Sequence, residues 1–200
     1  MCSENRARLV RPNVEEPRTH APAPALLAAF VDWAMCQTPQ RRIVTLAARY
    51  ASLGGSRKAE FLDLAWPQVD REAGQIRTKR AKQRGKKRGE VIDVVAISPA
   101  LGQVPDVLAA LRDPDCLYFR RVVPTPTPRV ASRHSGRRLM SSAVSESVLT
   151  PEQRFTFHDL RAFYATEHKR QRGALPDLNK NPAATAGIYD RNREVKRAAL

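Results

Sequence analysis

G-S-R-K-A-E-F-L-D-L-A-W, residues Gly55 to Trp66, is the stretch of sequence that decides the fold. Two glycines end a preceding helix here, and the residues that follow predict another helix, with Ser56 as its cap. Arg57 would begin that helix, where its guanidinium can meet a phosphate beside the N-terminal backbone amides. Glu60, one turn later, is expected to anchor this arginine or the hairpin rather than to do chemistry. An ordinary surface arginine is the alternative.

A second string, F-H-D-L-R, runs from Phe157 to Arg161. His158 and Arg161 are three residues apart on a predicted helix, so they are expected to share a face. A third string, A-G-I-Y-D-R, places Tyr189 on a short predicted helix near the end of the chain. Taken singly, the pair could be surface or capping residues, and the tyrosine could belong to the core.

A lysine completes the set of candidate catalytic side chains. Lys82 lies where the first predicted strand meets a basic turn, and from there it can reach a leaving 5′ oxygen as a general acid. Lys79 competes for this role, and spacing does not decide between them. Such residues can break a phosphodiester without metal: the tyrosine attacks, cations hold the charge on phosphorus, and a donor protonates the leaving oxygen. The candidate catalytic residues are Arg57, Lys82, His158, Arg161 and Tyr189.

The composition favours a nucleic-acid partner. The chain has 200 residues, a hydrophobic fraction of 42% and a net charge of +15, and its pI is about 10.7. These values predict one domain and a polyanionic partner. Cys2, Cys36 and Cys116 are odd in number and lack metal-ligand spacing, which predicts reduced thiols in a cytoplasmic, nucleoid-associated protein. We expect no membrane span, because no apolar run approaches about 18 residues, and no secretion signal, because the start of the chain has no apolar stretch. We expect no cofactor or metal, because P-loop, carboxylate-cluster and zinc-site patterns are lacking.

The periodicity predicts a mainly α fold with a small antiparallel β-sheet, an α+β domain. Residues 1–24 are expected to form a disordered or linker-like tail, and residues 25–200 one domain. Helices are predicted from residue 25, from Thr38 to Gly54 with the threonine hydroxyl as cap, over residues 99–111, and from Thr156 to Gly173. Strands are predicted over residues 75–82 and 90–98.

Two segments are strongly basic. From Arg77 to Arg88, eight of twelve residues are Lys or Arg and none is acidic. This predicts a hairpin that tracks phosphates, with a merely solvated basic hairpin as the alternative. The segment Phe119–Ser142 has six arginines, no acid and three prolines, and it predicts irregular structure, either a DNA-contacting loop or disorder. The predicted DNA-binding residues of the hairpin are Arg77, Lys79, Arg80, Arg84, Lys86, Lys87 and Arg88.

Together these strings resemble the catalytic domain of the tyrosine recombinases, the phage integrase family. Gly55–Trp66, followed by Val69-Asp70, resembles the first arginine box, and Phe157–Arg161 resembles the second. Thr185 and Tyr189 resemble the closing motif with its nucleophile. The resemblance spans residues 25–200, and it implies an integrase-like catalytic domain that assembles on double-stranded DNA as an oligomer.

The resemblance implies site-specific DNA recombination or integration. In that family the tyrosine forms a 3′-phosphotyrosyl bond and a 5′ hydroxyl leaves, so neither metal nor ATP is needed. The two arginines would neutralise the non-bridging oxygens. A catalytically inactive DNA-binding remnant and a small basic RNA-binding protein are the alternatives.

The chain also departs from the family pattern. Asn179 stands where a histidine is usual, which predicts weaker catalysis, and the stretch from Arg161 to Tyr189 is short. A core-binding domain ahead of the catalytic one is expected to be absent or vestigial. The family pattern also places a helix with an apolar stripe between Leu117 and Gln153, where this chain has its arginine- and proline-rich segment. These departures suggest a truncated, partly degenerate member.

Overall fold

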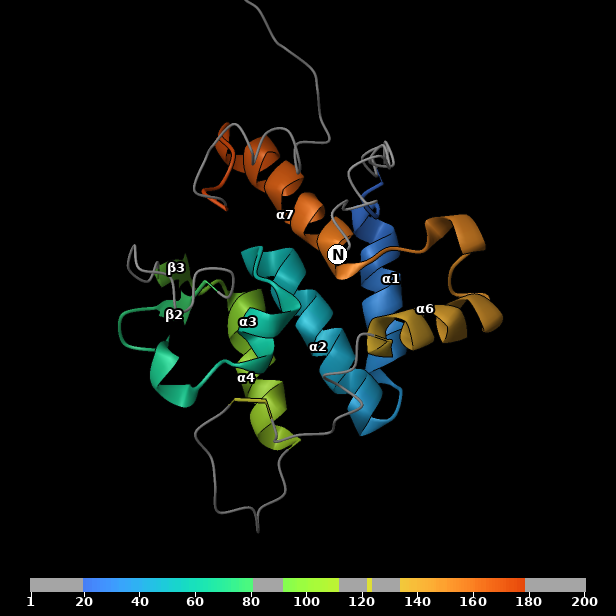
Figure 1. Cartoon of the computed structure of the whole chain (residues 1–200), viewed down its shortest axis with the longest axis horizontal. Coiled ribbons are helices and arrows are strands. Elements are labelled where there is room, and N and C mark those ends of the chain that lie inside the picture. Colours follow the sequence, from blue (N-terminus) through green and yellow to red (C-terminus); the bar gives the residue numbers. More distant parts are fainter. Residues whose placement is uncertain (1–19, 81–91, 112–121, 124–133, 179–200) are drawn as a thin grey trace, which may run out of the picture.

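A computed structural model of the chain describes residues 20–80, 92–111, 122–123 and 134–178. Helix α2 (Pro39–Gly54) lies at the centre and contacts α1 (Pro24–Met35), α3 (Lys58–Leu62), α4 (Pro99–Ala110), α6 (Ser135–Ser145) and α7 (Phe157–Arg172) (Figure 1). Short 3-10 helices η2 (Trp66–Gln68) and η4 (Pro151–Gln153) precede β1 and α7. The prediction of a mainly helical domain with a small sheet is confirmed.

The sheet has three antiparallel strands in the order β1-β2-β3, namely Val69–Asp70, Gln75–Lys79 and Ile92–Ala96. Both strands of the predicted hairpin are confirmed, although they are shorter than expected, and β1 was not predicted. Arg77 pairs with Val94 and Lys79 pairs with Ile92, so these four side chains share the exposed face. The turn of the hairpin lies outside the described residues.

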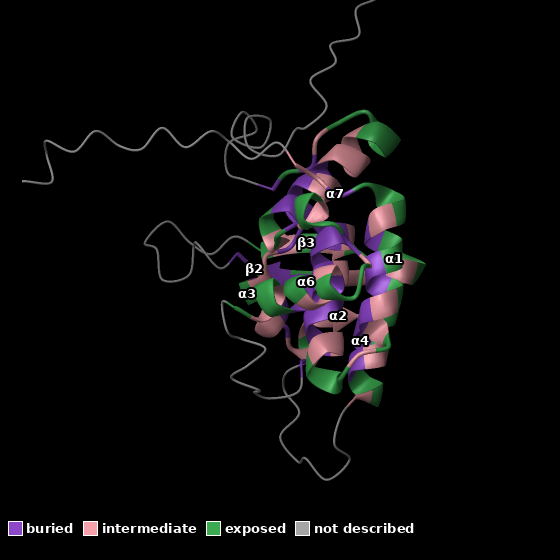
Figure 2. Cartoon of the chain, turned by 90° about the vertical axis from the view of Figure 1, so that its right-hand side faces the viewer, coloured by how far each residue is buried: buried purple, intermediate pink, exposed green. Residues whose placement is uncertain are grey.

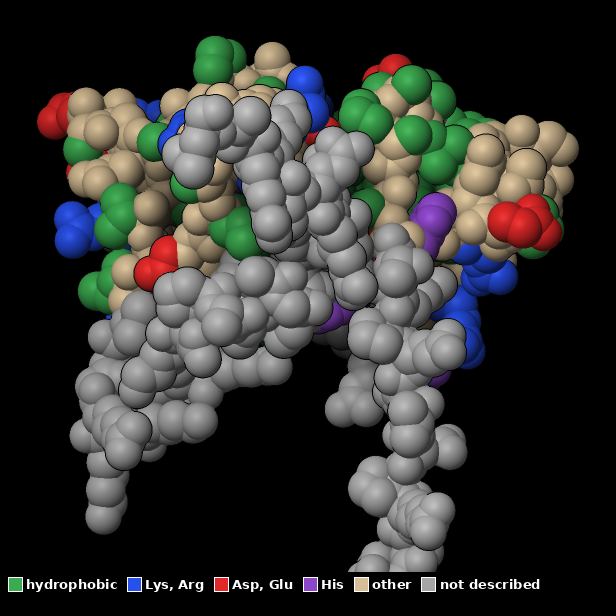
Figure 3. All heavy atoms as spheres, turned by 90° about the horizontal axis from the view of Figure 1, so that it is seen from above, with side chains coloured by type: hydrophobic (Ala, Val, Ile, Leu, Met, Phe, Trp, Pro, Cys, Tyr) green, Lys and Arg blue, Asp and Glu red, His purple; other side chains and the backbone are tan. Residues whose placement is uncertain are grey.

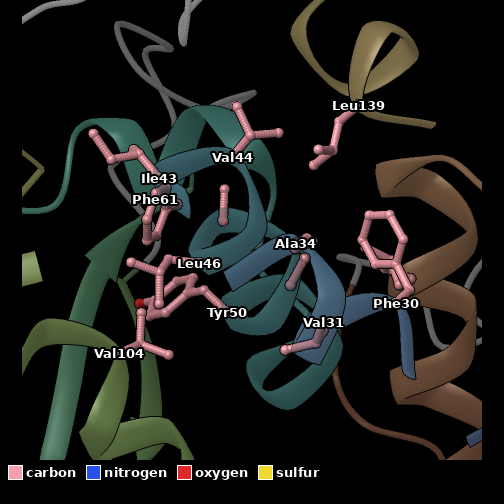
Figure 4. Packing of buried hydrophobic residues seen from close by; sticks show 14 of the residues in the cluster. Phe30, Val31, Ala34, Ile43, Val44, Leu46, Tyr50, Phe61, Val104 and Leu139 are labelled. Carbon is pink, nitrogen blue, oxygen red and sulfur yellow. The ribbon is translucent and has the colours of Figure 1, made fainter. Parts of the chain in front are cut away.

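The core gathers around α2. Phe30 of α1, Leu46 and Tyr50 of α2, Phe61 of α3 and Val104 of α4 are almost fully buried (Figure 4). Buried positions follow the inner faces of the helices, and exposed positions follow their outer faces (Figure 2). An amphipathic stripe of this kind stabilises a helix mainly through tertiary packing, because isolated helices of such length are marginal.

The predicted ends of two helices agree with the structure, but two predicted caps are wrong. Helix α2 ends at Gly55, whose φ is 65°, and α7 ends at Gly173, whose φ is 72°. Thr38 makes no side-chain capping bond. The N-cap of α3 is Arg57 rather than Ser56, and the Glu60 carboxylate accepts a hydrogen bond from the Arg57 amide.

The prediction of irregular structure over Phe119–Ser142 is wrong from Ser135 onward. Helix α6 occupies Ser135–Ser145 and buries Leu139, Met140 and Ala143 against α1 and α2. The helix that the family pattern placed in this region is therefore present. Earlier in the same segment, the backbone amide of Val122 donates to the Leu64 carbonyl at 2.8 Å, and the Val122 side chain is fully buried.

Within the described ranges no helix combines the length and apolarity needed to cross a membrane.

Candidate functional site

Arg57 stands at the junction between α2 and α3, held by Glu60. Its Nη1 lies 2.7 Å from Glu60 Oε1, and its backbone amide donates to Glu60 Oε2, also at 2.7 Å. The Glu60 side chain is 1% exposed and the Arg57 side chain 21% exposed. The expectation that Glu60 anchors this arginine is confirmed. The carboxylate orients the guanidinium while leaving part of it in reach of solvent, as a phosphate contact would require.

Arg161 lies in the interior beside the same junction. It is 4% exposed, and its Nη1 donates to the Gly55 carbonyl while its Nη2 donates to the Leu178 carbonyl at 2.7 Å. The bond to Gly55 joins residues 106 positions apart in the sequence, and Gly55 is two residues before Arg57. The structure thus brings the two predicted arginine motifs together at one loop.

His158 lies in the first turn of α7 and is exposed. A capping box fixes this turn: Thr156 Oγ1 accepts from the Asp159 amide at 3.3 Å, and Asp159 Oδ2 accepts from the Thr156 amide at 2.8 Å. His158 therefore faces solvent, whereas Arg161 is buried one turn further on. The sequence spacing predicted that both side chains share one face of the helix, but in the structure one is exposed to solvent and the other is buried.

Arg80 has different surroundings from those expected of a DNA contact. It is 7% exposed, its Nε donates to Asp93 Oδ1 at 2.6 Å, and its Nη2 donates to the Asp177 carbonyl at 2.9 Å. The acid missing from the Arg77–Arg88 stretch is thus supplied across the sheet by β3. Burial raises the pKa of Asp93 above its ordinary value, although the Arg80 guanidinium opposes this by favouring the ionised carboxylate.

The other predicted hairpin residues divide into two groups. Arg77 and Lys79 are exposed on β2 and remain candidate phosphate contacts. Figure 3 shows Lys and Arg side chains at several places on one face of the molecule, interspersed with hydrophobic side chains. The choice between Lys79 and Lys82 stays open. Six predicted site residues lie outside the described residues: Lys82, Arg84, Lys86, Lys87, Arg88 and Tyr189.

Sequence reasoning missed several residues around Arg161. A hollow of about 730 Å³ adjoins this side chain, and Tyr164, Asp93 and Asp177 are among its lining residues. Burial raises the pKa of Tyr164. The sequence does point to Asp93, because this acid lies on the more buried side of strand β3, next to the basic strand β2. Among the described side chains, no three His, Cys, Asp or Glu residues gather into a group that could hold a metal ion.

Comparison with known proteins gives a consistent structural answer. No protein-family model matches the chain, and neither does any curated protein sequence. Several solved structures do match. The Tn1549 transposon integrase in complex with circular intermediate DNA has a TM-score of 0.65 at 15% identity, and the match covers 94% of this chain and 65% of that one. The chain has the fold of the tyrosine recombinases.

Two more structures of this fold agree with the first. The XerA recombinase matches with a TM-score of 0.59 at 15% identity, covering 90% of this chain and 60% of the recombinase. A lambda integrase dimer bound to a COC′ core site matches with a TM-score of 0.58 at 16% identity, covering 94% of this chain and 66% of the integrase. The chain thus spans slightly less than two thirds of each of these three structures, all in the tyrosine-recombinase fold.

Proposed function

We propose that this chain breaks and rejoins DNA through a tyrosine nucleophile, as part of site-specific recombination or integration. The observation that carries the proposal is the bond from Arg161 to the Gly55 carbonyl, which brings two arginine motifs to one loop within the tyrosine-recombinase fold. Two structures that share the fold, the Tn1549 and lambda integrases, are complexes with DNA. The double-stranded DNA partner and assembly into an oligomer on DNA belong to the same proposal.

The proposed reaction assigns one task to each candidate. Tyr189 Oη gives its proton to solvent and bonds to phosphorus, while the bond from phosphorus to the 5′ oxygen breaks and that oxygen takes a proton from Lys82 or Lys79. Arg57, His158 and Arg161 stabilise the negative charge on the non-bridging oxygens. A hydroxyl from another DNA strand then reverses the step and releases the tyrosine.

A cleft with basic side chains is formed by residues next to the two arginine motifs in the sequence, although none of the described candidate catalytic residues lines it. A cleft of about 1250 Å³ lies between α6 and the start of α7, and its lining includes Lys58, Arg137 and Arg154 together with the acid Glu152. Arg137 is exposed, and Lys58 Nζ donates to Ser135 Oγ at 2.7 Å. Cationic side chains along a cleft favour phosphate contacts that fix the position of a duplex without reading its sequence.

Covalent trapping tests the proposal. The full chain is mixed with labelled duplex fragments from the DNA that flanks its own gene, denatured with detergent, and examined for protein-linked DNA. We expect an adduct that Tyr189→Phe abolishes and that Tyr164→Phe retains, because Tyr164 is half-buried and its pKa is raised. Arg57→Gln should slow adduct formation about 10²–10³-fold, as the loss of a preorganised charge contact does.

The competing functions predict other results. Salt-sensitive DNA binding without any adduct would replace the proposal with an inactive DNA-binding remnant. Binding to RNA that is indifferent to Arg57, Arg161 and Tyr189 and depends only on the total Lys and Arg content would favour a basic RNA-binding protein. An adduct that survives Tyr189→Phe would refute the assigned nucleophile.

A further inference from the structure

Two buried arginines from distant parts of the chain bind adjacent backbone carbonyls. Arg80, just after β2, donates to the Asp177 carbonyl at 2.9 Å, and Arg161 of α7 donates to the Leu178 carbonyl at 2.7 Å. Both side chains are below 9% exposure. Buried guanidinium groups are costly unless each has hydrogen-bonding partners, so this double contact is a specific feature of the fold.

Apolar packing holds the same segment from the other side. Leu178 is 8% exposed and packs with Ala162 and Ala165 of α7, where Leu175 joins them. Gly55 also lies against this side chain: a Cβ built there would stand 2.8 Å from Leu178 Cδ2. The segment Leu175–Leu178 is therefore fixed by carbonyl bonds and by apolar contacts at once.

Arg80 is the residue that links this segment to the sheet. Its Nε is 2.6 Å from Asp93 Oδ1, and the two side chains are 8% and 24% exposed. Asp177 Oδ1 lies 3.8 Å from Arg80 Nη2, but the Asp177 side chain is 82% exposed, so its carbonyl is the stronger contact. One guanidinium thus spans β3 and the segment that follows α7.

We propose that Arg80, oriented by Asp93, is a positioning residue that clamps Asp177–Leu178 against Arg161. The proposal rests on the proposed function, because it gives the clamp a purpose: Arg161 is a candidate phosphate ligand, Lys82 follows Arg80 closely in the sequence, and the chain continues from Leu178 toward Tyr189. A clamp at this point fixes the segment that Arg161 binds relative to β3 before DNA arrives. In this role Arg80 acts through Asp177–Leu178 rather than on the phosphate or the nucleophile.

Arg80→Met tests the clamp, with Arg71→Met as the matched control. Arg71 also pairs with an aspartate, Asp106, but both side chains are largely exposed, at 47% and 64%. The first readout is hydrogen exchange of the backbone amides of residues 174, 175, 177 and 178 in the free protein. We expect faster exchange in Arg80→Met and an unchanged rate in Arg71→Met.

The second readout separates positioning from DNA contact. In single-turnover trapping at saturating DNA, Arg80→Met should form adduct about 10- to 100-fold more slowly, because small misplacements of reacting groups have effects of this size. Its DNA affinity and the salt dependence of that affinity should stay close to those of the unmodified protein. Loss of affinity with an unchanged rate at saturation would instead make Arg80 a DNA contact and overturn the proposal.

A double variant protects the test against simple misfolding. Arg80→Met leaves the Asp93 carboxylate without its arginine, whereas Arg80→Met with Asp93→Asn removes both charges of the pair and should fold. The exchange result decides the clamp even if the unmodified chain forms no adduct, an outcome that would refute the proposed function alone. Unchanged exchange at residues 174, 175, 177 and 178 in both Arg80 variants would overturn the clamp.

Discussion

Gly55→Ala should destabilise the protein more than a glycine substitution normally does. Gly55 has a φ of 65°, in the left-handed region that L side chains rarely adopt. A Cβ at this position would stand 2.4 Å from Tyr164 Cδ1 and 2.8 Å from Leu178 Cδ2. The substitution therefore combines a backbone penalty with a steric one, next to the carbonyl that Arg161 binds.

The two penalties can be separated in magnitude. Left-handed backbone costs an L residue about 1–2 kcal/mol, and overpacking a filled site costs typically about 1–3 kcal/mol more. Gly173 supplies the control, since its φ is 72° and nothing lies within 4 Å of the position of a Cβ. We expect the free energy of unfolding to fall by about 1–2 kcal/mol in Gly173→Ala and by about 2–5 kcal/mol in Gly55→Ala.

Urea denaturation of both variants measures these differences. The double variant Gly55→Ala with Tyr164→Ala should lose less free energy of unfolding than the sum of the two single losses, because the ring that meets the new Cβ is then gone. Equal destabilisation by Gly55→Ala and Gly173→Ala, or strict additivity with Tyr164→Ala, would refute the steric argument.

Three other substitutions probe separate contacts, each read from equilibrium unfolding. Thr156→Ala removes the N-cap of α7 and should lower the free energy of unfolding by about 1 kcal/mol, whereas Thr156→Ser should retain most of it. Glu60→Gln weakens a pair whose carboxylate is 1% exposed and should lower the free energy of unfolding by about 1.5–3 kcal/mol. Glu167→Gln, at an i,i+3 pair whose arginine is 67% exposed, should cost less than about 1 kcal/mol, so equal costs would contradict the importance of burial. Burial lowers the pKa of Lys58 below its ordinary value of 10.5. In the pH range just below 10.5 the unfolded chain therefore holds a proton on Lys58 that the folded chain has released, so the free energy of unfolding rises with pH in that range. Lys58→Met should abolish that rise, and a persisting rise would assign it to another group.

Local signals predicted the helix ends because the residues responsible lie next to each other. The diglycine at residues 54–55, the capping box of Thr156 and the glycine at position 173 each determine structure within one turn. Helix α6 escaped notice because most of its residues are polar and the segment before it is rich in proline and arginine. Only three of its residues, Leu139, Met140 and Ala143, are buried, and so few apolar positions do not stand out in a polar stretch.

Among the described candidate residues, a contact between near neighbours could be predicted from the sequence, whereas the burial of individual side chains could not. The contact between Glu60 and Arg57 followed from spacing on one helix. The burial of Arg80 did not, because its partners Asp93 and Asp177 come from another strand and from a distant loop. Charge counting along a sequence treats every lysine and arginine as exposed, and only tertiary structure shows which of them an acid neutralises.

The bonds that hold Leu178 and Gly55 to Arg161 end on backbone carbonyls rather than on side chains. Every residue type offers the same carbonyl oxygen, so the hydrogen bond itself does not depend on the side chain, whereas the packing at Gly55 and Leu178 does. Substitutions that keep this packing leave the carbonyl bonds in place. Comparisons that score residue identity would overlook this anchor, whereas comparisons of backbone shape would retain it, as in a fold recognised here at 15% identity.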